Sequence, residues 1–154
     1  MLNETMLQEF LSEEELIDIG EQVPFGDLLD AWREAYSRFL LDRFEDAPFR
    51  SDAWRNLFRI VRPHVHPREE EVIAMMRRKH HDYGGGSLVE CGEAGVFVRG
   101  FDKLHRVLNL SRIEEAGRSA QIQESKQDAI DDLFNYVILG FLLVRGGVTE
   151  DVRS

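Results

Sequence analysis

The sequence predicts an all-α fold, a helical bundle with an additional helical segment before its core. Apolar side chains recur every three or four residues along most of the chain, which is the spacing of amphipathic helices. No stretch alternates convincingly as a strand, except in part Leu88 to Val98. The chain has 154 residues, 43% of them hydrophobic, which is enough for one proper core. We therefore expect one compact domain.

The first part of the chain, residues 1–66, is interpreted as an N-terminal helical extension. A helix start is expected at Ser12 to Glu15, whose end residues have the spacing of a capping box. Apolar residues at helical spacing predict a long helix from Phe25 to Phe44, ended by Asp46 to Pro48. A short helix is expected to follow from Ser51 to Ile60.

Residues 67–147 are expected to form the core from the last three long helices, and residues 148–154 a tail. The predicted helices cover about 67–82, 96–109 and 124–145. A glycine-rich loop separates the first two, and the last one ends at a glycine pair.

Charge and cysteine content exclude some classes of function. The net charge is −10, and residues 1–30 hold nine acids and no Lys or Arg. Direct DNA binding is not expected, because phosphate neutralisation needs clustered Lys and Arg. The single cysteine, Cys91, allows neither an internal disulfide nor a cysteine-rich zinc site. With no apolar run of membrane length and no signal-peptide pattern, we expect a cytoplasmic protein without membrane contact.

The predicted last helix carries one polar side beside its apolar side. At about 100° per residue, four side chains share this polar side: Glu124, Asp128, Asp132 and Asn135. Carboxylates one turn apart repel each other, so something cationic is expected between them. That cation is either a divalent metal or Lys and Arg from a neighbouring helix. The alternative is a helix side that is simply solvated.

Two further segments carry clustered charges. On the predicted helix 96–109, adjacent turns of one side present Arg99, Asp102, Lys103 and Arg106. These cations either bind a polyphosphate or pair with the acidic helix. Three polar residues, Lys79, Asp82 and Tyr83, precede the glycine loop and are expected at the edge of a binding site.

These blocks, taken together, resemble a known family. They run Lys79…Asp82-Tyr83-Gly84, then Arg99-x-x-Asp102-Lys103-x-x-Arg106…Asn109-Leu110, then Glu124-Ser…Asp128…Asp132-Leu…Asn135-Tyr136. In order and approximate spacing they look like the nucleotide-modification-associated domain family of phage genomes. That family is similar to the all-α nucleoside triphosphate pyrophosphohydrolases of the MazG and dimeric dUTPase type. The resemblance covers about residues 69–145.

The resemblance implies a function and roles for the matching residues. Mg²⁺ or Mn²⁺ would be held by acidic side chains: Glu124, Asp128, Asp132 and Asp102. The phosphates would contact Arg99, Lys103 and Arg106, while Lys79, Asp82, Tyr83 and Asn135 would line the rest of the substrate site. The catalytic set would be Asp102, Lys103, Glu124 and Asp128. Water would attack a (deoxy)nucleoside triphosphate and release a monophosphate and pyrophosphate, in phage nucleotide metabolism or DNA modification.

Two other functions stay open. One is a nucleotide-binding module without hydrolysis, which the presence of only one carboxylate on the predicted helix 96–109 favours. The other is an interaction protein whose acidic first 30 residues meet a basic partner, in which case the core should stay stable without residues 1–22. The related families form dimers or tetramers, so a homo-oligomer is also expected. Its contact surface would be an exposed apolar side of Phe134, Ile138 and Phe141.

Overall fold

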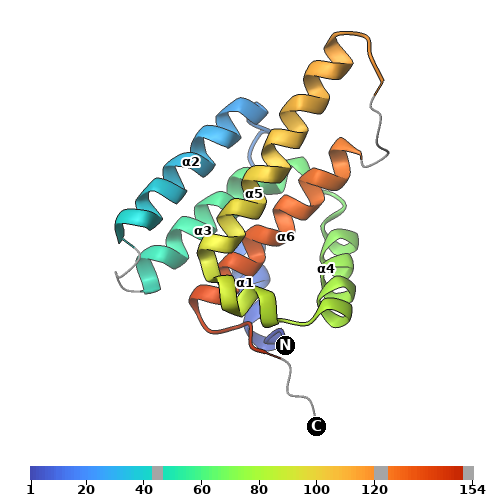
Figure 1. Ribbon diagram of the computed structural model, residues 1–154. Coiled ribbons are helices and arrows are strands. Elements are labelled where there is room, and N and C mark those ends of the chain that lie inside the picture. The colour runs from blue at the N-terminus through green and yellow to red at the C-terminus, as the bar shows by residue number, and fades with distance from the viewer. Residues whose placement is uncertain (43–46, 120–124, 151–154) are drawn as a thin grey trace.

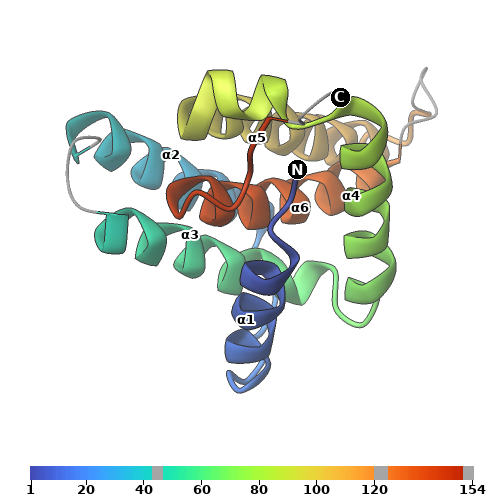
Figure 2. The same cartoon turned by 90° about the horizontal axis from the view of Figure 1, so that it is seen from below.

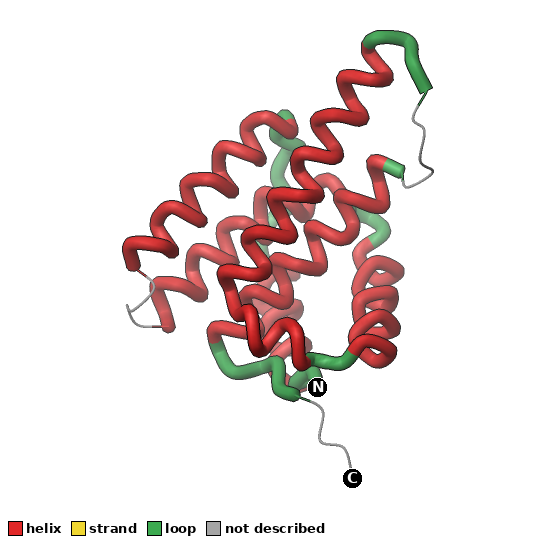
Figure 3. The backbone as a smooth tube through the Cα atoms, in the orientation of Figure 1, coloured by secondary structure: helices red, strands yellow, loops and turns green. Residues whose placement is uncertain are grey.

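The computed structural model describes residues 1–42, 47–119 and 125–150, and within these ranges the chain is helical without a strand (Figures 1 and 3). The all-α prediction is confirmed. The α-helices are α1 (Glu4–Glu15), α2 (Phe25–Asp42), α3 (Ala47–Val61), α4 (Glu69–Tyr83), α5 (Gly86–Glu115) and α6 (Lys126–Val144), with a 3-10 turn at Arg62–His64.

Four of the helices pack in a closed ring. Contacts connect α2 with α5, α5 with α6, α6 with α3, and α3 with α2. Figure 2 shows α6 between α5 and α3, with α4 at one end of this bundle and α1 crossing outside it. Because α6 is enclosed, its residues from Ala129 to Leu142 are buried except Asp131, Asp132 and Tyr136. The bundle is therefore organised around the most apolar helix.

The core also uses helices that precede residue 67. Trp32 of α2 and Trp54 and Phe58 of α3 are fully buried among side chains of α5 and α6. The core therefore extends beyond the last three long helices from which the sequence predicts it. Two amphipathic helices from residues 1–66 close the ring, since α5 and α6 could not cover their own apolar sides.

α1 joins the core at one edge of the bundle. Leu7 and Phe10 are buried, and the Phe10 ring stacks on Phe141 of α6 at 4.2 Å between centroids. Asn3 caps this helix by accepting a hydrogen bond from the Met6 backbone at 3.0 Å. The prediction of a helix start at Ser12 to Glu15 is therefore wrong. That segment ends α1, because the capping-box spacing also occurs inside acidic helices.

Two other helices begin earlier than predicted. α3 starts at Ala47 with Pro48 in its first turn, where the missing N–H of proline costs nothing. α5 starts at Gly86, so the partial strand expected at Leu88 to Val98 is helical instead. Gly92 interrupts α5 with φ 61° and ψ −156°, a conformation that only glycine adopts readily. This break concealed the regular helical period of the sequence.

The apolar side of α6 faces the interior of the chain. Phe134, Ile138 and Phe141 are all buried within one copy. The surface predicted for oligomer contacts is therefore wrong, and self-association itself stays a prediction. Among the described residues, no helix has the length and apolarity to cross a membrane.

α4 joins the core through the buried side chains of Val72, Ile73 and Met76, and polar bonds add to its contact with α6. Arg68 pairs with Asp131 at 2.5 Å, and Asn135 donates to the Val72 carbonyl at 3.1 Å. Figure 1 shows α4 beside the four-helix ring rather than within it, and α4 contacts α6.

Candidate functional site: a cationic cleft between α4, α5 and α6

A cleft of about 460 Å³ opens where α4, α5 and α6 meet. Its polar lining residues are Lys79, His80, Ser87, Arg99, Lys103, Asp132 and Asn135. Its apolar and aromatic lining residues are Met76, Leu88 and Leu139 together with Tyr83 and Tyr136. A volume of this size fits one small-molecule ligand. We call it the α4–α5–α6 cleft.

Helical spacing explains why these side chains converge. Arg99 and Lys103 are four residues apart on α5, so they project from the same side of that helix. Asp132, Asn135 and Tyr136 share a side of α6 for the same reason. Lys79 and Tyr83, again four apart, end α4 on the opposite wall of the cleft. The cleft thus collects residues from all three blocks that the sequence singled out.

The Asp132 carboxylate lies between two lysines from different helices. Its Oδ1 is 3.0 Å from Lys79 Nζ of α4, and its Oδ2 is 2.9 Å from Lys103 Nζ of α5. The Asp132 side chain is 20% exposed and that of Lys103 is 21% exposed, so this pair is partly shielded from solvent. Lys side chains from neighbouring helices, one of the two kinds of cation expected beside the acidic helix, therefore contact Asp132.

Arg99 is the third cationic side chain of the cleft, after Lys79 and Lys103. Its Nη2 donates to Ser87 Oγ at 2.6 Å, across the break of α5 at Gly92. Ser87 therefore fixes the Arg99 guanidinium at the edge of the cleft. Among the acidic, Lys and Arg side chains that line the cleft, three are cations and one is an anion, so the cleft favours an anionic ligand.

Asn135 is buried between the cleft and a neighbouring groove. Only 6% of the residue is exposed, its Nδ2 donates to the Val72 carbonyl, and its Oδ1 accepts no hydrogen bond from the described protein. Because the Val72 carbonyl needs a donor, the amide orientation is fixed. Asn135 thus joins α4 to α6 directly behind the Lys79–Asp132 pair.

Asp128 lines a second groove on the other side of α4, together with Arg68, Arg78 and Asp131. Asp128 and Ser125 form a capping box: the Asp128 backbone donates to Ser125 Oγ at 3.0 Å, and Asp128 Oδ2 accepts from the Ser125 backbone at 3.1 Å. Hydrogen bonds from Ser125 lower the pKa of Asp128 below its ordinary value, aided by the charges of Lys79 and Arg68. The Asp128 carboxylate therefore stays ionised and caps the N-terminus of α6.

Several predicted site residues do not line the cleft. Asp82 is exposed and its Oδ1 lies 3.2 Å from His81 Nδ1. Asp102 is exposed on α5, and Arg106 is outside the cleft lining. Glu124, predicted as a metal ligand and catalytic residue, lies outside the described residues.

The carboxylates that the structure describes do not make a metal site by themselves. Within residues 1–42, 47–119 and 125–150, no group of three His, Cys, Asp or Glu side chains is placed to hold an ion. Asp132 is neutralised by two lysines and Asp128 is engaged with Ser125. The predicted set of Asp102, Asp128 and Asp132 is thus not gathered around one point in the described chain.

Sequence reasoning missed part of the lining. Ser87 and Tyr136 both line the cleft, although neither is among the predicted site residues. Tyr136 follows Asp132 by four residues, so the helical period contained the signal for it. Ser87 carried no such signal, because its position depends on the break at Gly92.

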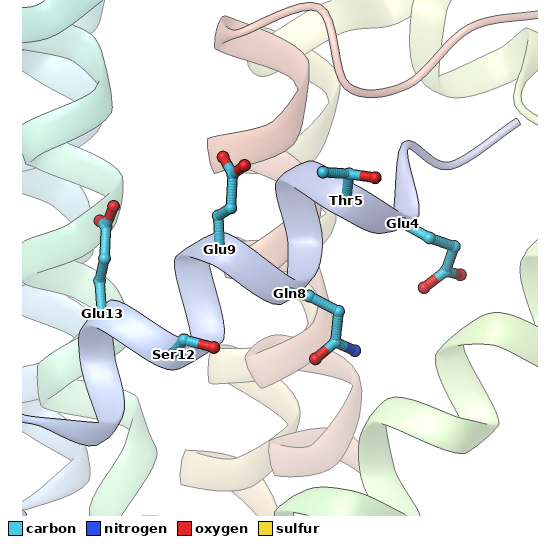
Figure 4. Close-up of a pocket in the computed structure, with 6 residues that line it drawn as sticks. All are labelled: Glu4, Thr5, Gln8, Glu9, Ser12 and Glu13. Carbon is cyan, nitrogen blue, oxygen red and sulfur yellow. The ribbon is translucent and has the colours of Figure 1, made fainter.

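The acidic face of α1 is a separate surface. Figure 4 shows the residues along a shallow depression on this helix: Glu4, Thr5, Gln8, Glu9, Ser12 and Glu13. Glu4 accepts hydrogen bonds from Arg77 of α4, and Glu13 pairs with Arg55 of α3 at 2.6 Å. These acids therefore attach α1 to its own chain, which weakens the hypothesis of a free acidic arm for a basic partner.

In comparisons with known proteins, no protein-family model matches the chain, and no curated protein or solved structure is detectably similar to it. The resemblance to the phage family and to the MazG-type enzymes therefore stays a prediction.

Proposed function

We propose that this protein binds a nucleoside triphosphate in the α4–α5–α6 cleft. The proposal rests on one observation: Lys79, Arg99 and Lys103 converge from two helices on a cleft that also has apolar and aromatic lining residues. Lysine supplies point charges for phosphate oxygens, and arginine supplies paired donors. The phosphates would lie along these cations.

The nucleoside would lie against the remaining lining. Tyr83 is 82% exposed at the cleft, and Tyr136 is half-buried beside Leu139. Aromatic faces stack on nucleobases with little dependence on the base. The cleft thus has a cationic part for the phosphates of a nucleotide and an aromatic part for its base.

Metal-dependent hydrolysis to a monophosphate and pyrophosphate is the second candidate. The observation that favours it is the ionised Asp128 one helical turn before Asp132 on α6. Carboxylate pairs of this kind hold Mg²⁺ together with substrate phosphates, and Mn²⁺ accepts similar ligands. Since the described residues do not complete such a site, hydrolysis depends on a further ligand, for which Glu124 is the predicted residue. The phage setting implied by the resemblance belongs to this candidate.

One experiment tests binding. Calorimetry with each ribo- and deoxynucleoside triphosphate should give binding to wild type and clearly weaker binding to Lys103→Gln. Arg106→Gln is the matched control, because it removes a cation one turn further along α5 but outside the cleft lining. Equal weakening in both variants, or no binding to wild type, would contradict the assignment of this cleft.

A second experiment tests hydrolysis. The same triphosphates are incubated with Mg²⁺ or Mn²⁺ and the products are separated by chromatography, with Asp128→Ala beside wild type. Ser125→Ala is the control, since it disrupts the same capping box but keeps the Asp128 carboxylate. Turnover lost in Asp128→Ala and retained in Ser125→Ala supports a role in hydrolysis. Equal loss of turnover in both variants would mean that Asp128 supports hydrolysis only by capping α6.

A further inference from the structure

The Lys79–Asp132–Lys103 triad has a consequence for which ligands enter the cleft. Both oxygens of one carboxylate each contact an ammonium group, at 3.0 and 2.9 Å, and the two lysines come from different helices. The carboxylate thus occupies the position between two cations that an anionic ligand would otherwise take. Ligand oxygens must replace it or share the lysines with it.

We propose that Asp132 is an internal counter-ion that competes with the ligand and thereby selects ligands with two linked phosphates. This inference rests on the proposed function of the cleft. A ligand with a single carboxylate or phosphate only replaces the Asp132 carboxylate at the lysines, so it gains little binding free energy. A diphosphate group carries more charge, and Arg99, one turn before Lys103 on α5 and also in the cleft lining, offers it a third cation. We therefore expect a diphosphate to bind with more free energy than the displacement of Asp132 costs.

This role differs from that of a metal ligand, and the two make opposite predictions. If Asp132 served only to hold a cation beside the phosphates, its removal would weaken phosphate binding. If Asp132 competes with the phosphates, its removal strengthens their binding in the absence of any metal. Asp132→Asn separates the two, because it removes the charge and keeps the shape of the side chain.

The chain offers a closely matched control at the next residue. Asp131 is also on α6, its side chain is equally exposed at 20%, and it also pairs with a cation, Arg68 at the start of α4, at 2.5 Å. It lines the second groove and is absent from the cleft lining. Asp131→Asn therefore changes net charge and one α4–α6 ion pair without changing the cleft.

The test is calorimetry with inorganic pyrophosphate and inorganic phosphate, at low ionic strength and with EDTA, on wild type, Asp132→Asn and Asp131→Asn. Wild type should bind pyrophosphate more tightly than phosphate. Asp132→Asn should bind pyrophosphate about ten-fold more tightly than wild type, with Asp131→Asn close to wild type. If Asp132→Asn does not fold by circular dichroism, Asp132→Ser removes the same charge with a smaller side chain.

Other results would overturn the inference in distinguishable ways. If wild type binds pyrophosphate and the Asp132 variants bind it equally or more weakly, Asp132 is not a competitor and only this inference fails. Equal gains at Asp131 and Asp132 would mean that net charge alone is responsible. Equal affinity of wild type for phosphate and pyrophosphate would exclude the selection of linked phosphates. If neither wild type nor any variant binds either anion, the phosphate site itself fails.

Discussion

Two glycines let tryptophan rings approach a helix backbone in the core. The Trp32 ring covers Gly100 of α5, and the Trp54 ring covers Gly140 of α6. Each indole also has a hydrogen-bond acceptor: Trp32 Nε1 donates to the Phe97 carbonyl and Trp54 Nε1 to Glu93 Oε1, both at 2.9 Å. The rings are thus fixed by contact and by hydrogen bonding, and they have little room to shift.

Gly140→Ala should therefore destabilise the protein by about 1–3 kcal/mol, since overpacking of a filled core has this cost. A Cβ at Gly140 would lie 2.6 Å from three Trp54 ring atoms. Gly26→Ala on α2 is the control, because nothing lies within 4 Å of its added Cβ and alanine favours a helix. Urea unfolding measures both. A Gly140→Ala variant as stable as Gly26→Ala would show that the Trp54 ring moves freely.

Individual site residues could be predicted only in part from the sequence. The sequence predicts Lys79, Arg99 and Lys103 as residues of a binding site, and the structure brings all three to one cleft. Spacing within a helix cannot say which cation meets which carboxylate, because that depends on how α4 and α5 lie against α6. The sequence alone therefore leaves both a metal and Lys or Arg open as the cation beside Asp132, and the fold shows the two lysine contacts.

At the scale of helices, α1 is fixed by a buried acid at its last turn. Glu14 is 1% exposed and accepts hydrogen bonds from Arg55 and Arg59 of α3, at 3.0 and 2.9 Å. Burial alone would raise the pKa of Glu14, but the two arginines outweigh it and lower the pKa below its ordinary value. The Glu14 carbonyl also accepts from Arg62 at 2.8 Å. The end of α1 is thus attached to three arginines.

Glu14→Gln should cost about 1.5–3 kcal/mol at neutral pH, because it removes the charged acceptor of hydrogen bonds from Arg55 and Arg59, whose own side chains are partly exposed. A carboxylate with a lowered folded pKa stabilises above its unfolded pKa, 4.5, and this contribution is lost as pH falls through the folded pKa. The stability difference between wild type and Glu14→Gln should therefore shrink below pH 4.5. Unfolding curves from pH 7 to pH 3 measure it, and a constant difference would contradict the assigned role of Glu14.

The boundaries of helices were predicted unevenly. The predicted range 124–145 agrees with α6 to within two residues, because glycines follow this helix and its apolar content is high. α1 and the first part of α5 were missed, since a mainly acidic helix and a helix broken at Gly92 both lack a clean period. Their helical state comes from packing, in particular of Leu7 and Phe10, which propensity alone does not reveal.

For the whole molecule, one hydrophobic cluster includes residues of every helix from α1 to α6. Residues 1–66 supply Trp32, Trp54 and Phe58 to this cluster, so they share one core with the rest of the chain. We therefore expect a single cooperative unfolding transition.

The measurement is urea unfolding followed by far-ultraviolet circular dichroism and by tryptophan fluorescence, which should coincide. A chain lacking residues 1–22 should lose most of its stability, because Leu7, Phe10 and the buried Glu14 leave the core with it. Two separate transitions, or a truncated chain as stable as the full one, would show that residues 67–147 fold independently.

The pairing of Trp32 and Trp54 also gives this protein a built-in optical probe. They are the only two tryptophans, both are buried, and their ring centroids are 5.9 Å apart in an edge-to-face arrangement. Neither lines the α4–α5–α6 cleft, whereas two of the three tyrosines do. Indole emission should therefore be blue-shifted and report folding alone, while ligand binding should change only the tyrosine signal. Folding and binding can be read from one sample at two excitation wavelengths, without any added label.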